Sequence, residues 1–157
     1  MARLDDLRTL IDARQFLVPC DGSAAAYEAL AFACTQAKRS RGRVFVVHVI
    51  EVKRTLPLDA EMSGEAQRGE DILTEAERIG DELEVRIEGE LLQAREAGHA
   101  IVDEAIERGI DVIVISTEYT SPFGEFQIGR TVQFVLKQSP CQVWLFRMPS
   151  RGGDGRT

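Results

Sequence analysis

The fold is decided by the stretch Phe16-Leu-Val-Pro-Cys-Asp-Gly-Ser23, in which a short apolar run ends in an acidic turn. The apolar run predicts a strand, and the pair Asp21-Gly22 is typical of a tight turn. Ser23 is a favoured N-cap residue, and apolar residues then recur at helical spacing from Ala24 to about Arg39. The stretch therefore predicts a strand that turns directly into a helix, which is the repeating unit of an α/β fold.

The same unit recurs along the chain. The runs Val44–Ile50 and Asp111–Ser116 are apolar without a break, which is typical of strands covered on both faces in a parallel sheet. Between and after these runs, the pattern predicts a loop at Glu51–Ser63, a helix around Ala66–Ile79 and a half-exposed strand at Leu83–Leu91. A helix from Gly98 to Gly109 follows, with Ile101, Val102, Ala105 and Ile106 on one face. The chain then forms a helix that turns Val132, Val135 and Leu136 inward, and it ends in a last strand at Cys141–Phe146.

Strands that alternate with helices predict a doubly wound, open α/β sandwich, because each right-handed crossover lays its helix on a face of the sheet. We expect a five-stranded parallel sheet with the order 3-2-1-4-5 in a single domain at residues 15–147. Residues 1–14 are expected to form a helical extension, and residues 148–157, rich in Gly and Arg, a disordered tail. The extension is amphipathic through Leu4, Leu7, Leu10 and Ile11.

The overall charge restricts the partners. The chain has a formal net charge of -7, whereas nucleic-acid binding needs a basic surface, so no nucleic-acid partner is expected. No apolar run approaches the roughly 20 residues that cross a bilayer, and the first residues lack a signal-peptide block, so we expect a cytoplasmic chain without membrane insertion. The local basic cluster Lys38, Arg39, Arg41 and Arg43 fits either a solvated helix end or an anionic partner.

The cysteines and histidines predict no metal chemistry. Cys20, Cys34 and Cys141 lie far apart without a Cys-x-x-Cys pair, and the chain has only two histidines. This pattern is neither a disulfide framework nor a zinc site. Small buried core residues are the expected role of Cys20 and Cys141.

The predicted strand order also indicates where a ligand would bind. Ligands of doubly wound sheets lie beyond the carboxyl ends of the strands, where the winding reverses. With the order 3-2-1-4-5, this point lies between the first and fourth strands. The segments Pro19–Ser23 and Ser116–Thr131 are therefore the ones expected to line a binding crevice.

At these segments the chain resembles the universal stress protein family, over nearly its whole length. No single piece is specific, but four occur in order at the family's spacing. The resemblance implies a homodimeric regulatory α/β module of a family in which some members bind ATP. The four pieces are Phe16–Ser23, Val44–Ile50, Gly98–Ile115 and Gly129–Val143.

The glycine motif of the ATP-binding members is only partly present. Those members are similar to one another in a Gly-x-x-Gly-x9-Gly-Ser/Thr stretch after the fourth strand. Carried over by position, the glycines fall on Ser116, Tyr119 and Gly129, and the hydroxyl falls on Arg130. Glycine lets the backbone approach a phosphate and adopt φ > 0, so that its N–H groups form an anion nest. We expect the large side chain of Tyr119 to crowd a triphosphate.

Other residues of this loop still suit an anion. Gly129 opens a helix whose free N–H groups and dipole attract anions. Arg130 and Thr131 offer a guanidinium and a hydroxyl to a phosphate, and Gly124 gives the rebuilt loop a flexible point. A plain helix start with an exposed arginine explains the same residues.

The nucleoside half of the crevice is intact by the resemblance. It places Asp21 near ribose and adenine, in the same turn as Pro19 and Ser23, and it places Val44 against adenine. Asp21 is equally explained as a turn residue that accepts backbone N–H groups, and Val44 as a buried strand residue. Because only the phosphate side is altered, AMP or a similar adenine nucleotide is favoured over ATP, and no cofactor is required.

Two functions fit these observations. One is a stress-response regulatory domain that binds an adenine nucleotide weakly or in altered fashion. The other is a nucleotide-free dimeric adaptor that regulates a partner, such as a membrane transporter, because Ile128–Trp144 resembles stress-protein domains attached to bacterial transporters. An enzyme is not expected, because the sequence shows no nucleophile–base pair, metal cluster or P-loop.

The last strand predicts a homodimer. It lies at a sheet edge, and unpaired edges are usually covered. Its sequence is apolar and free of proline, which suits antiparallel pairing with its twin across a two-fold axis. Cover by the N-terminal helix is the alternative. We expect Trp144 and Phe146 to face one side of the sheet and Val143 and Leu145 the other, in the interface Gln142, Val143, Trp144, Leu145 and Phe146.

Overall fold

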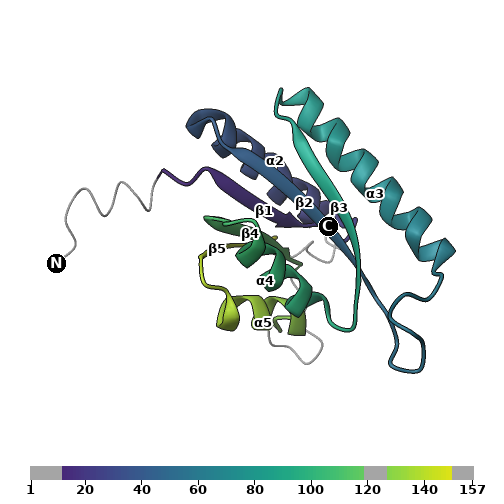
Figure 1. Ribbon diagram of the computed structural model, residues 1–157. Coiled ribbons are helices and arrows are strands. Elements are labelled where there is room, and N and C mark those ends of the chain that lie inside the picture. The colour runs from purple at the N-terminus through teal and green to yellow at the C-terminus, as the bar shows by residue number, and fades with distance from the viewer. Residues whose placement is uncertain (1–11, 119–126, 150–157) are drawn as a thin grey trace, which may run out of the picture.

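The strands form one parallel sheet with the order β3-β2-β1-β4-β5, which confirms the predicted fold class. The computed structural model describes residues 12–118 and 127–149. Figure 1 shows the sheet between two helical layers, with α2 and α3 on one face and α4 and α5 on the other. In chain order the elements are β1 (Gln15–Pro19), α2 (Ala24–Ser40), β2 (Arg43–Glu51), α3 (Ser63–Glu82), β3 (Ile87–Ala94), α4 (Ala97–Glu107), β4 (Val112–Thr117), α5 (Arg130–Gln138) and β5 (Gln142–Arg147).

Strand β1 is the centre of the sheet. It pairs in parallel with β2 on one side and with β4 on the other. Its side chains alternate between the two layers: Phe16 and Val18 pack under α2 and α3, and Leu17 packs under α4 and α5. Its start is fixed by Asp111, whose carboxylate accepts the backbone N–H groups of Arg14 (2.9 Å) and Gln15 (2.8 Å).

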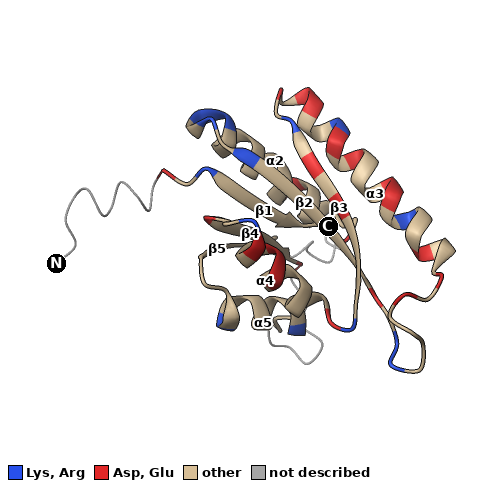
Figure 2. Ribbon diagram, in the orientation of Figure 1, with Lys and Arg blue, Asp and Glu red and all other residues tan. Residues whose placement is uncertain are grey.

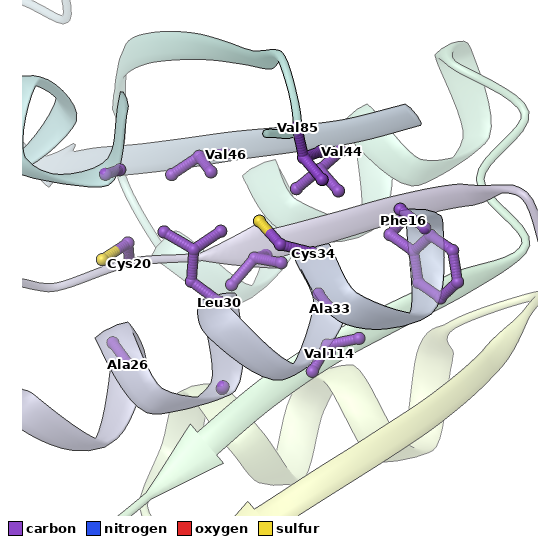
Figure 3. Close-up of a cluster of buried hydrophobic side chains, with 14 of the residues drawn as sticks. Phe16, Cys20, Ala26, Leu30, Ala33, Cys34, Val44, Val46, Val85 and Val114 are labelled. Atoms are coloured by element: carbon purple, nitrogen blue, oxygen red, sulfur yellow. The ribbon is translucent and has the colours of Figure 1, made fainter. Parts of the chain in front are cut away.

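Helix α2 lies close against the sheet because its inner face is made of small residues. Its Ser23 N-cap accepts the Ala26 N–H (3.2 Å), as predicted from the sequence. Figure 3 shows Leu30 and Cys34 of this helix pointing toward the strands, among side chains of β1, β2 and β4. The inner positions are Ala25, Ala26, Ala29, Leu30, Ala33, Cys34 and Ala37, all buried.

The third strand begins later than the sequence suggested. The expected strand at Leu83–Leu91 is wrong in its first part, because α3 continues to Glu82 and the chain then turns. Glu84 adopts a left-handed conformation with φ 59°, and the Val85 N–H closes the turn on the Gly80 carbonyl (2.8 Å). The alternation of apolar and charged residues that predicted a strand there includes Val85, which lies in the turn after α3 and is buried.

Two apolar residues expected to face inward are exposed. Leu136 of α5 keeps 44% of its surface and Ile106 of α4 keeps 59%. Each lies one position beyond a residue that does pack on the sheet, Val135 and Ala105. Since a residue advances about 100° around a helix per position, the second of two adjacent apolar residues can turn toward solvent.

The last strand alternates as expected. Trp144 and Phe146 pack on the α2 side of the sheet, and Val143 and Leu145 on the α5 side.

The predicted helical extension and the predicted disordered tail fall mostly on residues 1–11 and 150–157, which lie outside the described part of the chain. Residues 12–14, which are described, lead into β1 without helical structure. In the part of the chain that the structure describes, no helix has both the length and the hydrophobicity of a membrane span.

Gly42 allows the close approach between the end of α2 and the segment before β1, which gives a first prediction. A Cβ atom at this position would lie 2.2 Å from the Arg14 carbonyl oxygen, and backbone atoms cannot swing away as a side chain can. We expect Gly42→Ala to lower the free energy of unfolding by about 2 kcal/mol or more, measured by urea denaturation.

Gly64 provides the matched control for this substitution. It lies in α3, and a Cβ atom there meets nothing within 4 Å. Gly64→Ala should leave stability unchanged or raise it by up to about 1 kcal/mol, because alanine favours the helix. Equal stability of the two variants would contradict the steric account.

Candidate functional site

A crevice opens where β1 and β4 diverge at their carboxyl ends. It has a volume of about 270 Å³ and lies at the predicted switch point of the sheet. The lining comes from four places: the turn after β1, the end of β2, the start of α4, and the end of β4 with the start of α5. The crevice is therefore formed by the reversal of winding itself.

One wall of the crevice is apolar. It combines Val47 and Val49 of β2, Ile101 of α4, and Ile115 and Val132 from the β4–α5 side. All except Val49 are buried, so the wall is fixed by packing. Such a wall suits a flat, largely apolar group, and a few polar groups around it would set the orientation of the ligand.

His48 is the one buried polar side chain among the described residues, with 7% of its surface exposed. Its Nδ1 lies 2.8 Å from the Cys20 carbonyl oxygen. Because a carbonyl only accepts, Nδ1 carries the proton, and in the neutral ring Nε2 is left as an acceptor. The bond ties the end of β2 to the turn after β1, so it holds two sides of the crevice in register.

Glu51 ends β2 and brings a negative charge to the crevice. Its Oε2 accepts the Ala97 N–H (2.9 Å) at the start of α4. Glu96, at the N-cap position, makes no side-chain cap bond, so the carboxylate of Glu51 caps the helix in its place. The sequence prediction did not include Glu51, although an acidic residue directly after a buried strand could have indicated it.

Within the described residues, the start of α5 has no side-chain cap. Gly129 is the N-cap residue and makes no side-chain cap bond, and the first intrahelical bond runs from the Gln133 N–H to the Gly129 carbonyl (3.0 Å). The N–H groups of Arg130, Thr131 and Val132 thus have no intrahelical acceptor. Since Thr131 and Val132 line the crevice, it has a helix N-terminus that attracts anions on one side.

The opposite rim is shaped by the turn after β1. The Asp21 carboxylate accepts the Ser23 N–H (2.9 Å), and Arg68 of α3 donates to the Asp21 carbonyl (3.1 Å). Gly22 completes the turn with φ 88°. Both explanations given for Asp21 on sequence grounds are compatible with this geometry, because the carboxylate serves the turn and also lines the crevice.

The structure brings together some of the predicted site residues. Pro19, Asp21, Ser116 and Thr131 line the crevice. Ser23 caps α2 beside it. Two further predicted residues, Gly129 and Arg130, form the start of α5, whereas Gly124 and Tyr119 fall outside the described residues.

The placement of Val44 in the crevice is wrong. Val44 is fully buried near the start of β2, between Phe16 and Ile87 on the neighbouring strands. The residues of β2 that line the crevice lie nearer its end and are Val47, His48, Val49 and Glu51. Val49, for example, lies five positions beyond Val44, or about 16 Å along a strand. Within a run of similar apolar residues, the sequence does not distinguish the two ends.

The crevice contains a thiol that burial keeps protonated. Cys20 is 3% exposed, and desolvation raises its pKa to about 11, an effect that the Gly22 backbone N–H partly opposes and the nearby Asp21 charge reinforces. Among the described residues, no three His, Cys, Asp or Glu side chains are arranged to hold a metal ion. Burial therefore makes Cys20 a poor nucleophile at neutral pH.

Comparison with known proteins gives one family and several solved structures. The family profile described as "Universal stress protein family" matches residues 13–147. A universal stress protein from Archaeoglobus fulgidus is 25% identical, with a TM-score of 0.73 over 84% of this chain and 97% of that chain. No curated protein matches the sequence.

Two further solved structures were determined with nucleotides. One is the universal stress protein from Archaeoglobus fulgidus in complex with dAMP, 22% identical, with a TM-score of 0.69 over 84% of this chain and 96% of that chain. The other is a universal stress protein in complex with cAMP, 19% identical, with a TM-score of 0.65 over 86% of this chain and 97% of that chain. At these identities the likeness shows the shared fold.

The raised pKa of Cys20 predicts slow alkylation. At pH 8 a thiol of pKa about 11 has roughly one hundredth of the thiolate of a thiol at 9.0. We expect iodoacetamide to label Cys20 at least roughly 100-fold more slowly in the folded protein than in urea, with the rate rising as pH approaches 11. Peptide mass spectrometry at several time points measures this rate, and native labelling as fast as in urea would contradict the burial argument.

Proposed function

The chain belongs to the universal stress protein family, and we propose that it is a stress-response regulatory module that binds an adenine nucleotide in the crevice between β1 and β4. We propose further that it takes a monophosphate in preference to ATP. The observation that carries the proposal is the uncapped start of α5 beside an apolar wall. Together these offer one anion site and one site for a flat ring.

The apolar wall supports the position of the base. Val47, Val49 and Ile101 belong to the apolar wall of the crevice, and a purine packed against them would have its ribose near the turn after β1. Asp21 on that turn is an acceptor for ribose hydroxyls. The dAMP and cAMP complexes of the similar proteins support an adenine nucleotide as the ligand class.

The charges of the crevice support a single phosphate. The N–H groups at the start of α5 and the Thr131 hydroxyl suit one phosphate group. Each further phosphate adds negative charge to a crevice that already contains the carboxylates of Asp21 and Glu51. Ser116 also stands where ATP-binding relatives have a glycine, so the backbone nest for a longer phosphate chain is altered.

This proposal predicts unequal stabilisation by nucleotides. AMP at about 100 times its dissociation constant should stabilise the fold by roughly 2.7 kcal/mol, which corresponds to a rise in Tm of about 5–10 °C for a chain of this size. ATP at the same concentration should give a smaller rise. Differential scanning fluorimetry with AMP, cAMP and ATP measures both.

Variants at two threonines test the location. Thr131→Val removes the hydroxyl at the start of α5 and should reduce the shift with AMP. Thr35→Val is the matched control, because Thr35 lies on the exposed face of α2 and its hydroxyl donates only to the Phe32 carbonyl (2.7 Å). A shift with ATP as large as with AMP would contradict the preference, and no shift with any nucleotide would contradict the binding function.

A dimeric adaptor is the second candidate function, and the two edges of the sheet favour it. The β3 edge includes Glu88, Gly89 and Glu90, and charged edge residues oppose pairing with another strand. The β5 edge is half-buried and apolar over most of its length. Phe32 of α2 extends it, with its ring centroid 4.9 Å from that of Phe146 and 6.1 Å from that of Trp144.

We therefore propose that β5 pairs with its twin in a homodimer. The outer side of β5 has no neighbouring strand within the described chain, so antiparallel pairing would satisfy its backbone groups and cover the aromatic cluster of Phe32, Trp144 and Phe146. A dimer of this kind leaves the crevice open, so it is compatible with the nucleotide function. It would also serve an adaptor that regulates a partner protein.

Light scattering tests the dimer. At micromolar concentration we expect twice the 17.5 kDa mass of one chain, and we expect Phe146→Glu to give a monomer that keeps its circular dichroism spectrum. Leu58→Glu is the control, because Leu58 is exposed in the loop after β2. A monomeric wild-type protein would contradict the interface.

A further inference from the structure

A second cavity lies at the opposite, amino-terminal edge of the sheet, far from the nucleotide crevice. It has a volume of about 420 Å³ and lies between the ends of α2 and α3 and the starts of β2 and β3. Figure 2 shows basic residues gathered at the end of α2 and acidic residues spread along α3. The charged residues of this basic cavity are Lys38, Arg41, Arg43 and Arg86, with Glu84 and Glu88.

Two of the four cations are used by the fold. Lys38 donates to the Leu83 carbonyl (3.4 Å) and lies 3.5 Å from the carboxylate of Glu84. Arg43 pairs with Glu88, and its guanidinium lies 5.4 Å from the centre of the Phe45 ring. These contacts within the chain account for the basic character of both residues, so no binding partner is needed to explain it.

The other two cations have no such explanation. Arg41 and Arg86 are exposed, and their side chains make no hydrogen bond or ion pair with the described residues. Arg41 follows the last turn of α2, where Lys38 and Arg39 already complement the helix dipole. Arg86 lies outside both helices, in the segment that leads into β3. The cavity thus has two unpaired guanidinium groups at its rim.

The backbone at the rim supports a role for Arg41. Arg41 has φ 56° and Glu84 has φ 59°, a left-handed conformation that normally takes glycine at a helix end. The chain therefore keeps charged side chains at two positions where glycine would relieve the backbone. Residues held in such conformations often serve a function beyond the fold.

We propose that the basic cavity binds a short carboxylate-rich segment of a partner protein. Its four basic and two acidic residues leave a local excess of positive charge on a chain whose net charge is -7. The cavity has room for a few side chains over a floor of Ala37, Val44 and Val85. Glutamate or aspartate side chains entering it would pair with Arg41 and Arg86.

The surrounding charges disfavour an extended polyanion. Helix α3 has seven acidic and two basic residues, with the acidic ones spread along it (Figure 2), and the segment that directly follows it, from Glu84 to Arg86, lines the cavity. A nucleic acid or an anionic bilayer would cover this helix as well and be repelled by it. A short acidic peptide can enter the cavity without crossing α3, so charge complementarity favours a protein segment.

Two glycine substitutions separate binding from folding. Arg41→Gly and Glu84→Gly both relieve the left-handed backbone, so neither should lower stability. Their charge effects are opposite. We expect Arg41→Gly to weaken binding of a fluorescein-labelled octaglutamate peptide about threefold or more, and Glu84→Gly to strengthen it by a similar factor.

Fluorescence anisotropy at low and high salt measures both effects, and binding should fall as salt screens the charges. Arg54→Gly is the control, since it removes one positive charge from an exposed turn in the loop after β2. Unchanged binding in Arg41→Gly, or equal weakening by Arg54→Gly, would overturn the site. Tighter binding of single-stranded DNA or phosphatidylserine vesicles with the same dependence on Arg41 would overturn the protein segment as occupant. The shift in Tm with AMP should be the same in Arg41→Gly and wild type.

Discussion

The whole arrangement depends on one constraint: β1 is hydrogen-bonded in parallel to both β2 and β4. A parallel neighbour on each side requires the chain to wind first one way and then the other, since crossovers keep one hand. Helix α2 therefore leaves β1 on one face of the sheet, while α4 precedes and α5 follows β4 on the opposite face. At the carboxyl end of β1 these helices diverge, and the crevice is the space that their divergence leaves.

The polar contacts around this point make the crevice asymmetric. His48 bonds to the Cys20 carbonyl and Glu51 caps α4, so the β2 side is closed by protein groups and carries negative charge. The start of α5 has no side-chain cap from the described residues, and its first N–H groups have no intrahelical acceptor. One helix N-terminus at the crevice is thus occupied by a carboxylate of the chain, and the other suits an anion. In the proposed function, the ligand is therefore oriented with its anionic end toward α5.

The sequence predicted the architecture because hydrophobic periodicity and turn residues are local signals. The strand that ends just before the Asp21-Gly22 turn and the helix capped by Ser23 are examples, and both are found where expected. The errors come from tertiary context. Val44 and Val49 belong to one uniform apolar run, so only the register of β2 against β1 shows which of them reaches the crevice. Glu51 acquires its role through Ala97, 46 residues away, which no local pattern reveals.

The same strand connects the two ends of the molecule. β2 starts at Arg43, on the basic cavity, and ends at Glu51, on the crevice, and its middle is buried between β1 and β3. A slip of one residue would exchange the side chains that β2 packs in the two layers, such as Val46 and Phe45, so the packing fixes its register and the distance between the two cavities. The β5 edge lies across the sheet, next to β4. The nucleotide, the acidic segment and the second copy that we propose would therefore occupy separate places on the fold, and a regulatory module needs such separation if the three are to bind together.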